Sequence, residues 1–328
     1  MRLCFVVHRY APYPGGSEYY VQWMAEECVR RGIEVTVFAG ENRLHQGDLN
    51  GVRVTANPMV LHEPFHAVIV HGGDVGTQNH VLSHIALIRG PVMYLIIKPS
   101  HSQVCLQGLR DARWIGCSTF EDWDHVKQYS MEHKAVAVKH GIHPIKRLGQ
   151  KGLFRTRHNI APSKKMFLSC GGYWHNKKMK ELAQVFESVA TENMLLVTTG
   201  YDNRSQLMPS PSQHVLPLLL ENEHEVGEAI ADADLYIMHS SEEGFGLVLL
   251  ECLLNKTPWI SRHIAAARIL QSFGRTYQND EELQWLLQYY SPSQEMIDRG
   301  VEYVHQHHLI QHTVDQILAA IQTGEGSQ

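Results

Sequence analysis

No stretch of about 18 consecutive apolar residues occurs in this sequence, so it predicts no transmembrane helix. The six cysteines lack the spacing of a metal site or a disulfide framework, and most of them lie in apolar runs. They are expected to be buried thiols in a reducing compartment, which predicts a cytoplasmic protein. A formal net charge of −5 excludes a protein that binds nucleic acid through its overall charge alone.

Both halves of the sequence alternate short apolar runs with amphipathic helical patterns, which is typical of Rossmann-like α/β domains. The length of 328 residues suits two modest domains better than one large sheet. We place the domains at 1–144 and 166–310, with a last helix within 311–328.

The linker between these domains, 145–165, contains several Lys and Arg residues and no Asp or Glu. One interpretation is a solvated connector. The other is a contact with an anionic acceptor, either lipid head groups or nucleic acid.

The most informative stretch is 239–255, HSSEEGFGLVLLECLLN. It follows a predicted buried strand at 235–238 and continues into an amphipathic helix. Gly244 and Gly246 flank Phe245, so the backbone can approach a ligand without a Cβ in the way. The first turn of the helix offers unpaired N–H groups and a positive dipole end, which suits a phosphate.

Two glutamates bracket this turn. Glu243 directly precedes the glycines, and Glu251 lies in the second turn of the helix. A carboxylate is a hydrogen-bond acceptor with two oxygens, so each residue could hold two donors at once. The alternative is a pair of solvated acids on a helix.

A second candidate loop lies near the start of the chain. It separates a predicted strand at 3–7 from a predicted helix at 18–31, and Gly15 and Gly16 directly precede that helix. The glycines form either a flexible turn or a backbone cradle for a phosphate or sugar.

Polar residues follow three predicted strands of the first half, and ligands of open α/β sheets bind outside such strand ends. His71 and His101 are the catalytic candidates among them. His8, Lys98 and His101 are candidates for the acceptor side. For each histidine the alternative is a loop residue without a role.

Two motifs together resemble family 4 of the glycosyltransferases. The run EGFGLVLLE at 243–251 is similar to their E-x7-E signature. The loop after the first strand is similar to theirs at Pro12, Pro14, Gly15, Gly16 and Glu18. The resemblance implies the GT-B fold, in which two Rossmann-like domains with parallel sheets face each other across a cleft. It also implies a retaining transferase that uses a nucleoside diphosphate sugar and no cofactor.

The same resemblance implies roles for individual residues. Glu251 would accept hydrogen bonds from the ribose of the sugar donor, and Glu243 would bind hydroxyls of its sugar near the reacting carbon. The turn Gly244, Phe245, Gly246 and Leu247 and the pair Gly15 and Gly16 would approach the diphosphate.

Lys178 matches a family lysine that binds the donor diphosphate, and Lys177 or Lys180 could assist it. Tyr173 stands where the family carries an arginine with the same ligand, so we place Tyr173 in the donor site as well. Losing a bidentate guanidinium predicts a changed donor affinity or donor identity.

Asp232-Ala-Asp234 has the D-x-D pattern that binds metal in the other large glycosyltransferase fold. Because family 4 sequences commonly carry Asp just before this strand, we interpret Asp234 as structural and expect no metal. Lys178 and the N-terminal turn at 245–248 would then neutralise the leaving diphosphate.

Three other functions stay open for this sequence. They are a transferase that glycosylates modified bases of viral DNA, a nucleotide-sugar binder without activity, and a nucleotide-sugar epimerase. The sugar, the nucleotide, the acceptor and the oligomeric state are not determined by the sequence.

Overall fold

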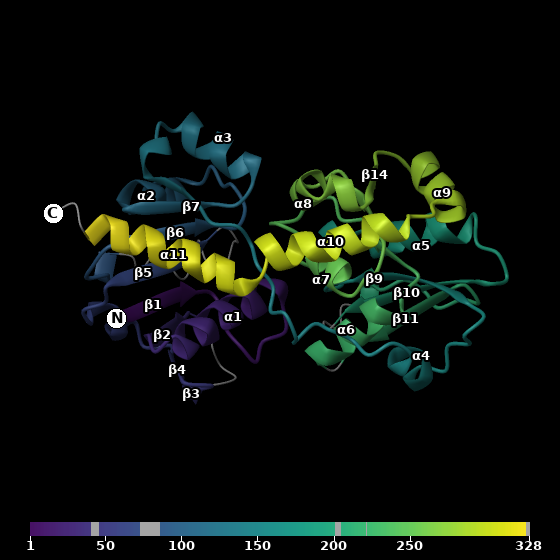
Figure 1. Cartoon of the computed structure of the whole chain (residues 1–328), viewed down its shortest axis with the longest axis horizontal. Coiled ribbons are helices and arrows are strands. Elements are labelled where there is room, and N and C mark those ends of the chain that lie inside the picture. Colours follow the sequence, from purple (N-terminus) through teal and green to yellow (C-terminus); the bar gives the residue numbers. More distant parts are fainter. Residues whose placement is uncertain (41–45, 73–85, 201–204, 221, 326–328) are drawn as a thin grey trace. The chain divides into compact units, whose positions relative to one another are not determined.

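The computed structural model of the protein describes residues 1–40, 46–72, 86–200, 205–220 and 222–325. The chain divides into two compact units (Figure 1). Unit 1 comprises Met1–Ile142 and His308–Gln328, and unit 2 comprises His143–His307. The segment 145–165, predicted as a linker, is thus part of unit 2.

Unit 1 contains an eight-stranded sheet in the order β3-β4-β2-β1-β5-β6-β7-β8. All neighbouring strands pair in parallel except the edge strand β3, which runs antiparallel to β4. The strands are β1 (Arg2–Val7), β2 (Glu34–Ala39), β3 (Gly47–Leu49), β4 (Val52–Thr55), β5 (Ala67–Gly72), β6 (Val92–Ile96), β7 (Trp114–Cys117) and β8 (Ala135–Ala137).

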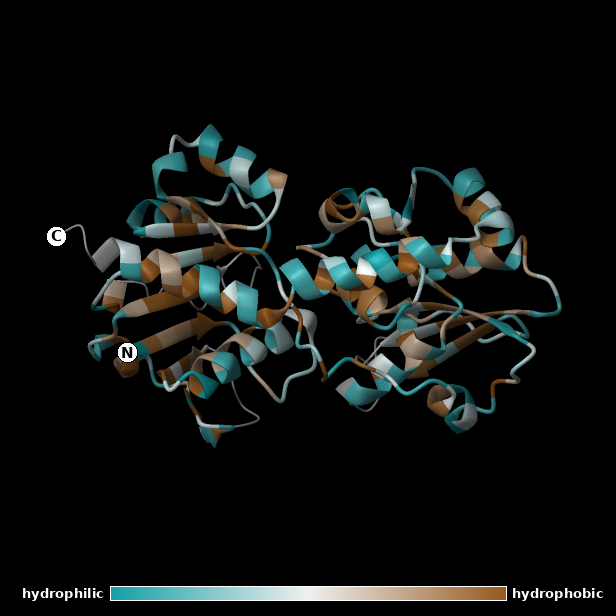
Figure 2. Ribbon diagram, viewed as in Figure 1, coloured by the Kyte–Doolittle hydropathy of each residue, from teal (hydrophilic) through white to brown (hydrophobic). Residues whose placement is uncertain are grey.

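The central strands of this sheet are apolar along their whole length because both of their faces are covered. The side chains of Leu3 to Val6 and of Ala67 to Val70 are fully buried. Figure 2 shows these strands as the most hydrophobic part of the unit. The helices of unit 1 are α1 (Gly16–Arg30), α2 (Gln103–Asp111), α3 (Phe120–Gln128) and α11 (Ile310–Glu325).

The last helix, α11, packs on α1. Arg31, just after α1, forms an ion pair with Asp315 at 2.5 Å and donates to the Gln311 carbonyl at 3.1 Å. The final segment of the chain is therefore part of unit 1.

Unit 2 contains a six-stranded parallel sheet in the order β11-β10-β9-β12-β13-β14. Its strands are β9 (Lys165–Cys170), β10 (Met194–Gly200), β11 (Val215–Leu219), β12 (Leu235–Met238), β13 (Trp259–Arg262) and β14 (Arg275–Tyr277). Its helices are α4 (Leu153–Arg157), α5 (Met179–Glu187), α6 (Glu223–Asp232), α7 (Val248–Leu254), α8 (Ala265–Ile269), α9 (Asp280–Tyr289) and α10 (Gln294–His307).

The strand order of each sheet reverses at one point. In unit 2 the chain proceeds from β9 outward to β11, then returns to the other side of β9 and proceeds from β12 to β14. The reversal in unit 1 lies between β1 and β5. Ligands of open α/β sheets bind outside the carboxyl ends of the strands at such a point.

Buried histidines join the two segments of unit 1. The His308 Nδ1–H donates to the His140 carbonyl at 2.7 Å, and Ile142 and Ile310 continue the contact through backbone hydrogen bonds. The His140 ring lies 4.9 Å from the Tyr20 ring. Burial, together with His71 and His308, lowers the pKa of His140 to about 3.

This depressed pKa predicts acid sensitivity of unit 1. Below about pH 6.5 the unfolded chain protonates His140 while the folded chain does not, so the free energy of unfolding falls as the pH falls. One such group contributes about 1.4 kcal/mol per pH unit. Urea unfolding between about pH 6 and about pH 4 should show a shallower pH dependence for His140→Gln than for the wild type. Equal slopes would contradict the prediction.

Candidate active site

Two loops of unit 2 leave the carboxyl ends of the neighbouring strands β9 and β12, where the strand order reverses. They are joined by hydrogen bonds. The Ser241 N–H donates to the Asn176 carbonyl at 2.8 Å, and the Asn176 side-chain amide donates to the Glu242 carbonyl at 3.1 Å. The sheet thus brings the loop that contains Lys178 and the signature loop side by side.

Glu243, the first signature glutamate, forms an ion pair with Lys177 at 2.5 Å. Both side chains are largely buried. The Lys177 chain passes over Gly171, where a Cβ would lie 3.0 Å from Lys177 Cε, and Gly171 has a φ of +148°. Lys177, expected only as an auxiliary residue, is thus the cation that contacts Glu243.

Lys178, predicted to bind the diphosphate, precedes α5 in the left-handed conformation, with a φ of 54°. Its ammonium contacts Glu181 on the first turn of the same helix at 3.1 Å. The lysine is half-exposed, so this surface pair adds little stability.

Tyr173 is fully buried, at 0% exposure. Its hydroxyl donates to the Thr198 carbonyl at 2.9 Å or to the Leu218 carbonyl at 3.0 Å, on strands β10 and β11. Burial raises its pKa to about 12. The expectation that Tyr173 lies in the donor site is therefore corrected: the residue that stands in place of the family arginine packs on the sheet.

The signature turn has the backbone that its glycines predict. Gly246 has a φ of +102°, and a Cβ there would lie 3.0 Å from Ile264 Cδ1, so this position favours glycine. Phe245 is buried, while Gly244 and Leu247 are partly exposed. The helix α7 begins directly after Leu247.

Glu251, the second signature glutamate, is buried in α7 beside Arg147, with Arg147 Nε 3.5 Å from Glu251 Oε1. Arg147 is a residue of the site that was not predicted from the sequence. It lies in a run of basic residues, and such a run does not indicate which acid an individual arginine contacts.

His239, at the end of β12, is a second residue that the sequence analysis missed. Arg262 donates to His239 Nε2 at 3.0 Å, so the other ring nitrogen carries the proton and donates to the Tyr277 hydroxyl at 2.7 Å. Burial lowers the pKa of His239 to about 4. A neutral imidazole therefore supports the start of the signature loop.

In unit 1, the loop after β1 contains the predicted glycine pair. Gly15 precedes α1, and the Glu18 carboxylate folds over it so closely that a Cβ would lie 2.1 Å from Glu18 Oε2. Arg9 holds the same carboxylate at 3.3 Å. In the part of the chain that the structure describes, no heavy atom beyond its chain neighbours and the backbone of α1 lies within 4 Å of the Cβ position of Gly16, so a ligand could approach its backbone.

His8, His71 and Lys98 lie at the carboxyl ends of β1, β5 and β6, which are neighbours in the sheet. His71 is buried, with its ring 5.8 Å from that of Tyr20. Lys98 is exposed.

His101 lies farther along the chain and is exposed. Its Nδ1 is 2.8 Å from the Tyr129 hydroxyl, and its ring contacts the edge of His125. The two predicted catalytic histidines thus occupy different surroundings.

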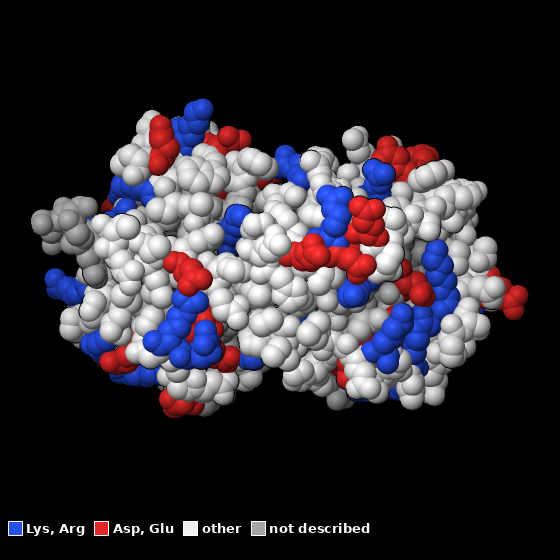
Figure 3. Space-filling view, viewed as in Figure 1, with Lys and Arg blue, Asp and Glu red and all other residues white. Residues whose placement is uncertain are grey.

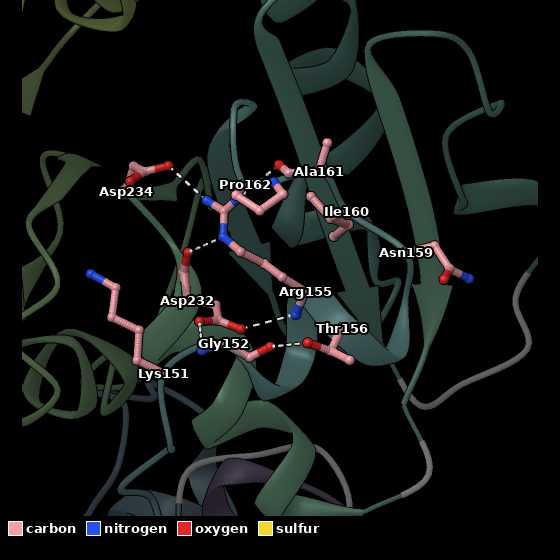
Figure 4. Close-up of a pocket in the computed structure, with 10 residues that line it drawn as sticks. All are labelled: Lys151, Gly152, Arg155, Thr156, Asn159, Ile160, Ala161, Pro162, Asp232 and Asp234. Carbon is pink, nitrogen blue, oxygen red and sulfur yellow. Dashed lines mark hydrogen bonds and ion pairs between the residues drawn. The ribbon is translucent and has the colours of Figure 1, made fainter.

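The D-x-D residues hold the segment that contains α4 (Figure 4). Asp232 accepts from the N–H groups of Gly152 and Arg155, and the Arg155 guanidinium contacts Asp234 at 2.8 Å. These carboxylates line a hollow of about 710 Å³ together with Lys151. Among the described residues, no group of three or more His, Cys, Asp or Glu side chains could hold a metal ion.

The three arginines of 145–165 face acids of their own unit. Arg157 forms an ion pair with Glu228, as Arg155 does with Asp234 and Arg147 with Glu251. On the face shown in Figure 3, Lys and Arg gather on the right-hand side of unit 2, near α4, with few Asp or Glu among them. The three arginines of the predicted basic run are therefore compensated by acids, whereas its lysines Lys151 and Lys165 are exposed.

Within the described part of the chain, no helix is long and apolar enough to cross a membrane.

Comparison with known proteins supports the family resemblance. Residues 150–268 match the family described as "Glycosyl transferases group 1", which confirms the resemblance predicted from the motifs. The chain is 28% identical over 115 residues to N-acetyl-alpha-D-glucosaminyl L-malate synthase of Bacillus anthracis. That match spans 34% of this chain and 30% of the synthase.

Solved structures confirm the predicted GT-B fold. The glycosyltransferase WaaG, involved in lipopolysaccharide biosynthesis, is similar with a TM-score of 0.72 and 17% identity, over 97% of this chain and 98% of WaaG. HepE of Anabaena, solved in complex with UDP-glucose, is similar with a TM-score of 0.77 and 14% identity, over 98% of this chain and 100% of HepE.

The burial of Tyr173 predicts a structural role for its hydroxyl. Tyr173→Phe should lower the free energy of unfolding by about 1–3 kcal/mol because buried hydrogen bonds are lost. Tyr173→Arg should lower it further because a guanidinium would be buried in place of the phenol. Urea unfolding measures both changes. A Phe variant of unchanged stability that binds nucleoside diphosphates more weakly would show instead that the hydroxyl contacts the ligand.

Proposed function

We propose, on the match of residues 150–268 to the group 1 glycosyltransferases, that the protein is a retaining, metal-independent glycosyltransferase. It would move a sugar from a nucleoside diphosphate sugar to an acceptor. One observation carries this proposal beyond the family match: both signature glutamates lie at the reversal point of one sheet, and each contacts a cation from another segment of unit 2.

We assign binding of the ribose to Glu251, and binding of the diphosphate to Lys178 and the first turn of α7. Glu251 would accept hydrogen bonds from the ribose hydroxyls, because a carboxylate is an acceptor with two oxygens. Lys178 and the N–H groups at the start of α7 would neutralise the diphosphate as it leaves. Since Tyr173 is buried, the lysine would do so without the arginine that the family carries.

We assign the transferred sugar to Glu243, whose carboxylate is held beside the signature turn by Lys177. For retention without a covalent intermediate, a phosphate oxygen of the leaving group would take the proton of the acceptor hydroxyl on the same face of the sugar. This route requires no strong general base. It therefore demands no proton transfer from the acceptor hydroxyl to His71 or His101, which stay candidates for positioning.

We assign the acceptor to unit 1, where His8, Lys98 and His101 follow strand ends. A cytoplasmic location stays part of the proposal, and so does an acceptor that is a glycan, a lipid or a small molecule. A base of viral DNA is less favoured, because the arginines of 145–165 face acids of their own unit.

A donor screen tests the proposal. One or more of UDP-glucose, GDP-mannose and ADP-glucose should raise the melting temperature and be hydrolysed slowly without an acceptor, because a ligand of the folded state stabilises it. Lys178→Ala should lower the hydrolysis rate by roughly 10²–10³, the usual effect of removing a charge stabiliser of a transition state.

The matched control is Lys165→Ala, which removes an exposed lysine at the amino end of β9, away from the candidate site, and should leave the rate unchanged. Binding of a donor sugar without hydrolysis or transfer would favour the non-catalytic binder, and turnover to an epimer without an acceptor would favour the epimerase. A Lys178→Ala protein that hydrolyses the donor at the wild-type rate would contradict the role of this lysine.

Metal removal tests the interpretation of Asp232 and Asp234. Because their oxygens contact Arg155 and backbone N–H groups, activity should survive EDTA. The measurement compares turnover with and without EDTA, with added magnesium or manganese as the control. Full loss of activity that either ion restores would show that a metal takes part.

A further inference from the structure

Arg147 is a residue of the basic segment 145–165 to which the proposed function gives no role. It is buried, and its guanidinium lies against the second signature glutamate, with Arg147 Nε 3.5 Å from Glu251 Oε1. The exposed fractions of the two side chains are 4% and 7%. A long, charged side chain is rarely buried to this extent unless it meets an opposite charge.

The backbone around Arg147 is fixed on two sides. Asn255, at the end of α7, donates to the Arg147 carbonyl at 2.7 Å and accepts from the Gly149 N–H at 2.9 Å. On the other side Gly149 lies so close to Gly227 of α6 that a Cβ on Gly149 would be 2.1 Å from the Gly227 carbonyl oxygen. The backbone that carries Arg147 is therefore anchored to both α7 and α6.

The same asparagine connects this segment to the glutamate. Its side-chain amide also donates to the Glu251 carbonyl at 2.8 Å, so one residue holds the backbones of both ion-pair partners. Nearby, the Cys170 thiol at the end of β9 is influenced by the Glu251 and Arg147 charges, although burial is the main cause that raises its pKa to about 12. The Glu251 side of the pair thus lies on the helix that follows the signature turn, at which the sugar donor is proposed to bind.

Stability alone does not account for this pair. Replacing a buried ion pair with apolar side chains of similar volume is often neutral or stabilising, because the desolvation of two charges offsets their attraction. At 3.5 Å the contact is an ion pair longer than a normal hydrogen bond. Such a contact compensates the carboxylate charge and fixes its orientation, and a carboxylate has acceptor sites on two oxygens.

We propose that Arg147 is a positioning residue that holds the Glu251 carboxylate oriented toward the ribose of the sugar donor, so that the protein discriminates ribonucleotides from 2′-deoxyribonucleotides. This inference rests on the proposed function. It adds that a residue of the connecting segment, and not of the signature, sets the strength of ribose recognition.

The experiment measures the dissociation constants of UDP, GDP and ADP and of their 2′-deoxy counterparts by isothermal titration calorimetry. The wild type should bind at least one ribonucleotide about tenfold or more tightly than its deoxy form, because a hydrogen bond to a charged group is lost. In Arg147→Met this preference should fall below about threefold, with weaker binding of the ribonucleotide. Glu251→Gln should lower the preference in the same way.

The control is Arg157→Met, which removes another arginine of the segment and its exposed ion pair with Glu228. It should keep the wild-type preference. Because Arg147→Met leaves a carboxylate buried without its cation, its folding is checked by circular dichroism. If it does not fold, Arg147→Lys serves instead, and its preference should fall at least about threefold because an ammonium does not reproduce a guanidinium.

The outcomes separate this inference from the proposed function. If no nucleoside diphosphate binds the wild type, both are overturned. If the wild type binds without a preference for ribose, the roles of Glu251 and Arg147 are overturned while donor binding stands. If Glu251→Gln loses the preference and a folded Arg147 variant keeps it, the inference about Arg147 alone is overturned.

Discussion

The parallel pairing of β9 with β12 is the constraint on which the candidate site depends. Leu235 pairs with Phe167 and Tyr236 with Leu168, although β10 and β11 lie between these two strands in the sequence. Because parallel strands end at the same edge of the sheet, this pairing brings the loops that follow them together. The hydrogen bonds between Asn176 and the signature loop then hold the two loops in contact.

Charge compensation is the second feature of the site. Each signature glutamate is largely buried and contacts a cation from a different loop: Lys177 for Glu243, and Arg147 for Glu251. Burying a carboxylate without an opposite charge is costly, and each pair supplies that charge from another segment of the unit. The pairs themselves add little net stability, because the desolvation of both charges offsets their attraction.

Tyr173 stands where the family carries an arginine. The sequence showed this difference but not where the tyrosine side chain lies. A phenol can pack against β10 and donate to a backbone carbonyl, whereas a guanidinium buried there would need a counter-charge. The Tyr173 side chain accordingly lies against the sheet and is shielded from solvent. Of the two positions that correspond to the family's arginine and lysine, only Lys178 carries a cation, and it is exposed enough to reach a phosphate.

The sequence by itself determined the alternation of strands and helices, the turn at Gly246 and the two signature glutamates, because these follow from periodicity and from backbone conformations that only certain residues adopt. It also determined the resemblance to group 1 glycosyltransferases. Only the tertiary structure decided which charges meet. Arg147 and Glu251 are distant in the sequence, and their contact exists because Asn255 and Gly227 fix the connecting segment against α7 and α6. Ion pairing between remote segments depends on packing, which local sequence patterns do not encode.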